Sequence, residues 1–472
     1  MYRFRAILCF SLAAAALLFV PFSSCAQDEP PPETNAPPKP AGYSFPSLGS
    51  DSSQGQLLPD SSPLTGMQNA TIGIPEIRHS YWAPGLQFSS NISSNGYGQS
   101  TSSWNATNYF IGTMSLLEAW ERGTLAVNYS GGGFVSSDPQ QGNGWYQQLA
   151  LAQSYQTRRW LLQAFDQFAY IPQSEFGFGG GTSLGIPGTS GPGSTTIPGL
   201  GGNYTNGQSV YGVGAYYNNT FGLQATYALT PRASLTASAS YGILDFVQSG
   251  NFNSNTFVSS LGYNYTLTRK DTLGLVYRFS SYQFPGNPQA YGTSAFNVAY
   301  GRKVTGHLAL SFFVGPEFTN YRVAFAGSSS STGLSIYSNL IYALPKGQLS
   351  AGYTHGLSAG SGVFIGSTLD QINATYSRNL GRVWSGGLNF GYARNAPVGG
   401  TTFTGYPNTS SWFMGGNLGR PIGPFFNFGL AYTANISNYS TSGCTGATCT
   451  GNFTYHIVTV SLQWHPRPFV LP

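Results

Sequence analysis

Few side chains in this chain of 472 residues could carry out acid–base or metal chemistry. A serine hydrolase needs a histidine that is hydrogen-bonded to an orienting Asp, Glu or Asn. His307 and Glu317 share one expected strand, but they are ten residues apart, roughly 33 Å along it. The other four histidines have no such neighbour in the sequence, and no group of residues has the spacing of metal ligands; these histidines are His79, His355, His456 and His465. We therefore predict that the chain is not an enzyme and needs no cofactor or metal.

Three titratable side chains, Arg278, His307 and Glu317, are candidates for lining a channel instead. Arg278 alternates with large apolar residues in its segment, which places it on the opposite face of a strand. By the same parity, His307 and Glu317 share the corresponding face of a neighbouring strand. Such charges either set the ion preference of a pore or pair with each other along its wall. Because they are so few, we expect weak ion selectivity and passage of neutral polar solutes.

The elements that carry these residues have the alternation of β-strands. Segments 273–280, 307–314 and 426–433 each alternate large apolar residues with small or polar ones. A period of two places each set on one face of a strand. In a soluble barrel the outer face would carry charge, whereas here neither face carries much. This combination predicts a barrel with lipid outside and water inside.

The composition excludes several other classes of protein. Charged residues make up 7% of the chain, against roughly 25% in an ordinary soluble domain. A content of 15% aromatic residues argues against disorder throughout, and a net charge of +5 without clustering is not typical of nucleic-acid binding. Beyond residue 26, no apolar run is as long as the roughly 18 residues that a transmembrane helix needs. An aromatic-rich, glycine-rich β protein is left.

The connections between the expected strands alternate in kind, which gives the strand number. Eight short turns are expected at Glu121–Gly123, Thr157–Arg159, Thr230–Arg232, Thr268–Asp271, Arg302–Gly306, Leu344–Gly347, Leu380–Arg382 and Arg420–Gly423. Nine longer loops lie near 94–104, 131–144, 171–209, 245–254, 284–293, 320–332, 358–367, 395–409 and 438–452. Seventeen connections predict an all-β fold, a transmembrane antiparallel up-and-down β-barrel of about 18 strands. Sixteen strands stay open, because the first strand and residues 210–217 are weakly patterned. Short turns are expected on the periplasmic side and long loops outside.

The amino terminus has the features of a targeting signal. A basic start and a short apolar stretch precede Ser24-Cys25-Ala26, which predicts a signal peptide over residues 1–26. The alternative is a lipoprotein signal that is acylated on Cys25. Residues 27–84 are rich in Pro, Ser and Gly without a period, which indicates a disordered periplasmic leader. The barrel is then expected over residues 85–472.

Four stretches between Trp160 and Phe318 resemble a family of outer-membrane β-barrels. They are YIPQSEFGFGGGTSLGIPG (170–188), SLTASASYGILDF (234–246), LGYNYTLTRKDTLGLVYRFSSYQFPG (261–286) and AYGRKVTGHLALSFFVGPEF (299–318). The family is porin-like, abundant in acidobacteria and mostly uncharacterised, and the resemblance covers about a third of the chain. It implies a porin-like outer-membrane protein, and it implies no substrate and no catalytic residues.

Two loops hold the remaining candidate residues. The loop 171–209 contains Glu175, Phe176 and Phe178, and loops longer than about 15 residues are usually functional or disordered. It either folds into the lumen and narrows it or stays outside. Cys444 and Cys449 are separated by four residues in another loop, and in an oxidising compartment they are expected to form a disulfide.

The predicted function is an outer-membrane channel for passive diffusion of small hydrophilic solutes, in a bacterial cell outer membrane. The alternative is a surface-exposed adhesin, or a structural barrel whose lumen is plugged. The expected partners are outer-membrane lipids and small polar solutes, with no nucleic acid, and the oligomeric state stays open. Eleven of the 20 Lys and Arg residues lie at the short turns, where they either meet anionic lipid headgroups or draw anions toward the pore. They are Arg122, Arg158, Arg159, Arg232, Arg269, Lys270, Arg302, Lys303, Lys346, Arg382 and Arg420.

Overall fold

A computed structural model describes nine stretches of the chain. These are residues 80–94, 104–137, 142–171, 215–247, 251–323, 327–358, 365–398, 407–441 and 450–471. The expected signal peptide, most of the leader, Glu175, Phe176, Phe178, Cys444 and Cys449 lie outside the described residues. Within these stretches, no helix has the length and hydropathy needed to cross a membrane.

Nineteen β-strands form one sheet in the described part of the chain. The first nine are β1 (Tyr81–Ser94), β2 (Trp104–Trp120), β3 (Gly123–Ser136), β4 (Gly144–Gln156), β5 (Trp160–Ile171), β6 (Tyr216–Thr230), β7 (Ala233–Phe246), β8 (Ser254–Thr266) and β9 (Asp271–Gln283). The others are β10 (Ala290–Lys303), β11 (Leu308–Val323), β12 (Gly327–Leu344), β13 (Gly347–Ser358), β14 (Ser367–Leu380), β15 (Trp384–Pro397), β16 (Pro407–Ile422), β17 (Phe426–Thr441), β18 (Thr450–Trp464) and β19 (Phe469–Val470).

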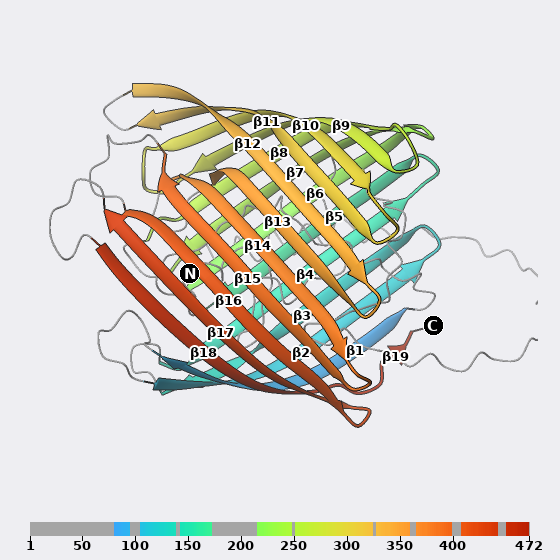
Figure 1. Cartoon of the computed structure of the whole chain (residues 1–472), viewed down its shortest axis with the longest axis vertical. Helices are drawn as coiled ribbons and strands as arrows, with labels where there is room; N and C mark the ends of the chain where they lie inside the picture. The colour runs from blue at the N-terminus through green and yellow to red at the C-terminus, as the bar shows by residue number, and fades with distance from the viewer. Residues whose placement is uncertain are drawn as a thin grey trace, which may run out of the picture. The chain divides into compact units, whose positions relative to one another are not determined.

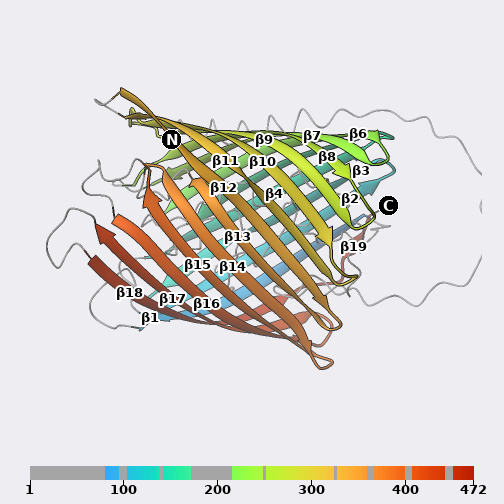
Figure 2. The same cartoon turned by 45° about the horizontal axis from the view of Figure 1, so that its top comes forward.

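The sheet closes into a barrel because its first long strand pairs with its last. Every strand from β1 to β18 is antiparallel to the next, and β1 also pairs with β18 from Leu86↔Trp464 to Ser93↔Ile457. The two strands lie side by side in both views of the barrel (Figures 1 and 2). The prediction of an up-and-down barrel with 18 strands is therefore confirmed, and the short β19 is an addition to it.

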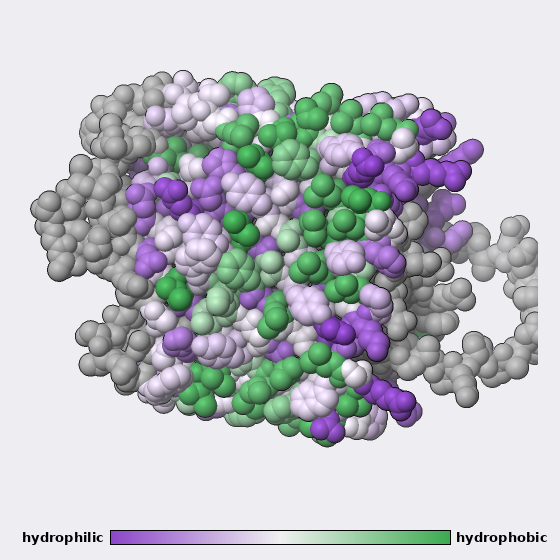
Figure 3. All heavy atoms as spheres, in the orientation of Figure 1, coloured by the Kyte–Doolittle hydropathy of each residue, from purple (hydrophilic) through white to green (hydrophobic). Residues whose placement is uncertain are grey.

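Alternate residues along each strand face opposite sides of the barrel wall. Leu261 on β8 and Leu275 on β9 are each 57% exposed, whereas their neighbours Ser260 and Val276 are buried. Most of the exposed set is apolar, and Figure 3 shows hydrophobic side chains spread over the outside of the strands on the face in view. Strongly hydrophilic side chains gather at the end where the short turns lie. The outer surface thus has the apolar band that a lipid bilayer requires.

All eight short turns predicted from the sequence join consecutive strands, whereas one predicted loop is wrong. β11 continues to Val323 and β12 begins at Gly327, so most of the predicted loop 320–332 is strand. Residues 328–332 are Ser-Ser-Ser-Ser-Thr, a composition typical of loops. They nevertheless form strand because their backbone pairs with β11, from Ser328↔Arg322 to Thr332↔Phe318.

The barrel begins earlier than the sequence indicated and ends in a tail that returns to its start. β1 begins at Tyr81, four residues before the predicted boundary, and Pro84 lies inside it. Proline is tolerated there because the pairing of β1 with β18 and β19 skips residues 83–85. In β19, Phe469 stacks on Trp82 with ring centroids 5.3 Å apart, and Leu471 N donates to Ser80 O. The tail after β18 therefore secures the end of β1.

Candidate functional site

The candidate site is the inward face of the barrel, where many uncharged polar side chains lie among apolar and aromatic ones. On β1 the inward positions are Gln87, Ser89, Asn91 and Ser93, opposite the outward Leu86, Phe88 and Ile92. Similar residues point inward from the other strands, among them Gln148, Gln167, Thr220, Gln224, Thr236, Ser260, Asn264, Thr293, Asn297, Asn395, Ser411, Asn435 and Thr459. Such a wall offers hydrogen bonds to water and to polar solutes without a strong electric field.

Arg278 and Glu317 lie on this inward face, one strand apart from each other. Arg278 pairs with Ala295 of β10, and Ala295 pairs in turn with Glu317 of β11. The Arg278 Nη2 donates to Ser335 Oγ of β12 at 3.1 Å, so the guanidinium lies along the wall. The carboxylate of Glu317 accepts hydrogen bonds from the Thr293 hydroxyl and from the backbone amide of Leu357. With 6% of its surface exposed, Glu317 is a buried anchor and is not an open lumen charge.

The backbone amide that binds Glu317 belongs to the C-terminal end of β13, which lies against the inner side of the barrel wall. The pairing of β12 with β13 stops at Ile336↔His355, whereas β12 stays paired with β11 for nine residues more, to Gly327. Beyond that point Leu357 contacts side chains that point inward from strands several places away in the sheet. The Tyr282 hydroxyl of β9 donates to Leu357 O at 3.3 Å. The end of the β13–β14 hairpin therefore lies inside the barrel.

An aromatic cluster fixes this hairpin end against β9 and β10. Tyr282, Phe284 and Tyr291 are buried together with Ile365, which follows the hairpin loop. The Tyr291 hydroxyl donates to Ile365 O at 2.5 Å, and its ring lies 2.9 Å from where a Cβ on Gly366 would stand. Gly366 also has a φ of +74°, a conformation that other residues rarely adopt. Glycine is thus required where the hairpin passes the tyrosine ring.

Sequence reasoning missed a second polar group at the same end of β13. His355 Nδ1 lies 2.6 Å from Asp370 Oδ1 on β14, and the Tyr353 hydroxyl donates to the same oxygen at 3.2 Å. The two residues are cross-strand partners, so only the register of β13 with β14 could have revealed them. Within the described residues, no serine or cysteine side chain bonds to this imidazole, and the same stretches hold no group of three metal-ligating side chains.

Three other titratable side chains do not face the lumen from a strand. His307 is not on a strand: it lies in the exposed turn before β11, where its backbone N–H donates to Thr305 Oγ1. The expectation that it faces the lumen from a strand wall is therefore wrong. Glu118 and Asp166 both have outward parity, and Asp166 accepts a hydrogen bond from Asn219.

Aromatic residues near the strand ends lie mostly on the outer surface of the barrel. Trp160, Tyr263, Trp384, Trp412 and Trp464 are exposed on the outer surface. Tyr109 instead points inward and is buried with Ile111, Phe134 and Tyr146. Its parity in β2 gives it this inward direction.

Comparisons with known proteins give matches to solved structures only. No protein-family model matches the sequence, and neither does any curated protein. Pseudomonas aeruginosa OccK2 (OpdF) is 10% identical with a TM-score of 0.43, covering 81% of this chain and 98% of that one. The outer membrane protein OpdK of the same species is 14% identical with a TM-score of 0.41, covering 82% and 99%. Acinetobacter baumannii OccAB3 is 9% identical with a TM-score of 0.38, again covering 82% and 99%.

Proposed function

We propose that this protein is a porin-like channel of a bacterial outer membrane, for passive diffusion of small hydrophilic solutes. The observation that carries the proposal is the closed barrel of 18 long strands with an apolar outer surface and a polar inward one. A transmembrane strand needs about 9–11 residues, and the strands from β1 to β18 all exceed that length. Closure leaves no unpaired edge in the hydrocarbon, which is the condition for a sheet to span a membrane.

The side chains that line the lumen favour passage of neutral polar solutes and do not select ions of one sign. Ser, Thr, Asn and Gln are the main polar residues at the inward positions, and charged residues are rare there. The two inward charges discussed above, Arg278 and Glu317, are of opposite sign and neighbour each other, so their fields largely cancel within the lumen. Water-filled barrels of 16–18 strands are wide enough to pass small solutes unless something narrows them.

Two elements narrow the pore in this proposal. The end of the β13–β14 hairpin occupies the inner side of β9–β11. The loop 171–209, with Glu175, Phe176 and Phe178, is proposed as the second constriction. The segment 1–26 is proposed as a signal peptide, residues 27–80 as a periplasmic leader up to the start of β1, and Cys444 with Cys449 as a disulfide in an outer loop.

Single-channel recording from the refolded barrel tests the proposal. Residues 27–472 should give steady openings in a planar bilayer, with weak preference between K⁺ and Cl⁻. Deletion of residues 172–214 should enlarge the openings. A deletion of residues 98–101 in the shorter β1–β2 loop is the control and should leave the conductance unchanged. A barrel whose fold is verified by circular dichroism and by heat-modifiable gel mobility, but which never conducts, would overturn the channel and favour a plugged or adhesive barrel.

A further inference from the structure

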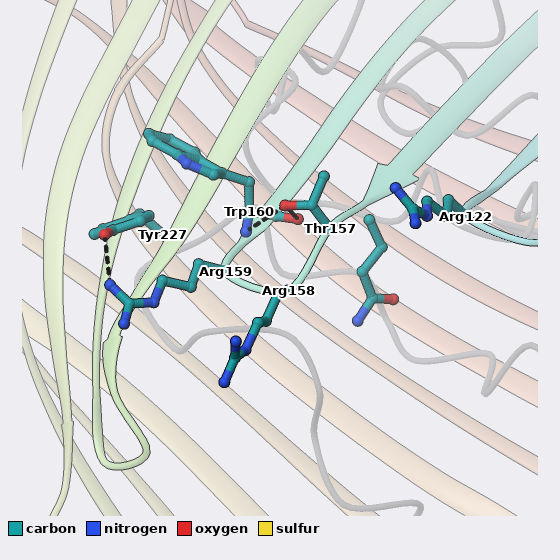
Figure 4. Close-up of a pocket in the computed structure, with 7 residues that line it drawn as sticks. Arg122, Thr157, Arg158, Arg159, Trp160 and Tyr227 are labelled. Atoms are coloured by element: carbon teal, nitrogen blue, oxygen red, sulfur yellow. Dashed lines mark hydrogen bonds between the residues drawn. The ribbon is translucent and has the colours of Figure 1, made fainter.

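Three arginines from two adjacent short turns line one hollow at the rim of the barrel. Arg122 comes from the β2–β3 turn, and Arg158 and Arg159 come from the β4–β5 turn. The hollow is completed by Gln156, Thr157, Trp160 and Tyr227. Figure 4 shows Arg158 and Arg159 extending in the same direction past the strand ends, with Tyr227 beside Arg159. Three of the residues that line this hollow are therefore cations.

Backbone hydrogen bonds hold these turns in place. Gln156 N donates to Arg122 O at 2.7 Å, and Ala228 N on β6 donates to Arg159 O at 2.8 Å. Inside the turn, Thr157 N donates to Trp160 O at 2.7 Å, and Trp160 N donates to Thr157 Oγ1 at 3.1 Å. The backbones of the arginines are therefore fixed relative to each other, and an anion that binds there need order only the side chains.

The three guanidinium groups have no carboxylate to balance them in the described part of the chain. No acidic residue is among those that line the hollow, and Glu121, the chain neighbour of Arg122, does not reach it. By contrast, Arg302 at another short turn lies 3.7 Å from an oxygen of Asp271. Among the described residues, Arg159 is the one of the three whose guanidinium makes a hydrogen bond, from Nη1 to the Tyr227 hydroxyl at 3.4 Å. Guanidinium groups without a carboxylate partner keep N–H donors available for a ligand. Such groups can form bidentate hydrogen bonds to two oxygens of a phosphate.

An apolar surface begins directly beside the cations. Trp160 packs on Tyr227 with ring centroids 4.7 Å apart, and 46% of the Trp160 surface is exposed on the outside of the barrel. Leu162 and Leu223 continue this exposed apolar surface along β5 and β6. Trp and Tyr prefer the depth of the headgroups because one end of each ring is polar. A ligand that meets both parts of this surface must be an amphiphile with an anionic head.

We infer that this surface binds the phosphodiester headgroup of an anionic phospholipid, with an acyl chain along Trp160 and Leu162. The inference presumes the membrane-spanning barrel proposed above, because that barrel places the short turns at a leaflet surface. Each basic residue near a negative surface strengthens binding about fivefold, so the three together give about 100-fold. The lipid then marks one side of the barrel, whereas turns with a single basic residue, such as those of Arg232, Lys346 and Arg382, bind no defined lipid.

Native mass spectrometry of the barrel in detergent tests the inference, with phosphatidylglycerol and phosphatidylcholine as probes. Wild type should bind one phosphatidylglycerol much more tightly than phosphatidylcholine. The triple variant R122Q/R158Q/R159Q should lose about 100-fold of that affinity. R232Q/K346Q/R382Q removes the same charge from three separate turns and is the matched control, with an expected loss of less than about threefold. Heat-modifiable gel mobility verifies that each variant is a folded barrel, and this readout does not depend on channel activity.

Three outcomes would overturn the inference. An equal loss in the control variant would show a diffuse charge effect without a site. Equal affinity for phosphatidylcholine would show that the aromatic and apolar residues alone hold the lipid. Binding of inorganic phosphate or of glycerophosphoglycerol as tight as that of the whole lipid would identify a free phosphate site. A folded barrel that selects phosphatidylglycerol but never conducts would keep the lipid site and overturn only the channel.

Discussion

Replacement of Glu317 by leucine should release the end of the β13–β14 hairpin and lower the stability of the barrel by about 3 kcal/mol. The carboxylate accepts hydrogen bonds from the Leu357 amide and the Thr293 hydroxyl; Glu317 and Thr293 are buried, and Leu357 is partly buried. Leucine would leave these donors without an acceptor, at about 1–3 kcal/mol for each buried group. It would also leave Arg278 without its neighbouring negative charge. Openings of the channel should become larger and more variable, because the released segment no longer packs on the inner wall.

Urea unfolding in lipid vesicles and single-channel recording measure these two effects. Glu118→Leu is the matched control: it makes the same chemical change on the exposed outer side of β2, where the carboxylate has no such role. Glu317→Gln keeps a side-chain oxygen that can accept one of the hydrogen bonds, so we expect an intermediate loss of stability. Unchanged stability and unchanged conductance in Glu317→Leu would show that the hairpin end is held by the Tyr291 cluster alone.

The general fold could be predicted from the sequence because its signals are local. Strand parity depends only on alternation along a few residues, and it correctly placed Arg278 and Glu317 on the inward face. The turns have short basic sequences, which gave the strand number. His307 was misplaced because its turn extends to the residue before Leu308, a boundary that the alternation of 307–314 hides.

The interactions of the candidate site could not be predicted, because they depend on contacts between distant segments. Tyr282 and Leu357 are 75 residues apart, and their contact follows from where β13 separates from β12. His355 and Asp370 meet because the register of β13 with β14 places them opposite each other. The length of the loop between these strands does not determine that register. The three arginines of the rim are spread over two turns, and their shared hollow depends on the order of strands in the closed sheet.

An arginine in the centre of the outer apolar surface should destabilise the barrel by about 2–4 kcal/mol, the cost measured for this residue at the bilayer midplane. Leu388 is suited to this test, because it is 61% exposed on the outside of β15 and the strand begins at Trp384. Four residues at about 3.3 Å each, on a strand tilted by about 40°, place it about 10 Å inside the interface. An arginine side chain there cannot reach the headgroups without distorting the bilayer.

The depth of the arginine in the bilayer, and not the replacement of leucine by arginine itself, should determine how much stability the barrel loses. Leu380 is 45% exposed on the same outer surface but ends β14 at a short turn, so Leu380→Arg should cost only about 0–1 kcal/mol. Both variants are compared by urea unfolding in vesicles and by the yield of folded barrel. If the Leu388 and Leu380 variants are equally stable, the exposed apolar surface of this barrel does not face hydrocarbon. The membrane-spanning interpretation would then fail together with the channel, because a barrel that faces water on both sides has no membrane to open.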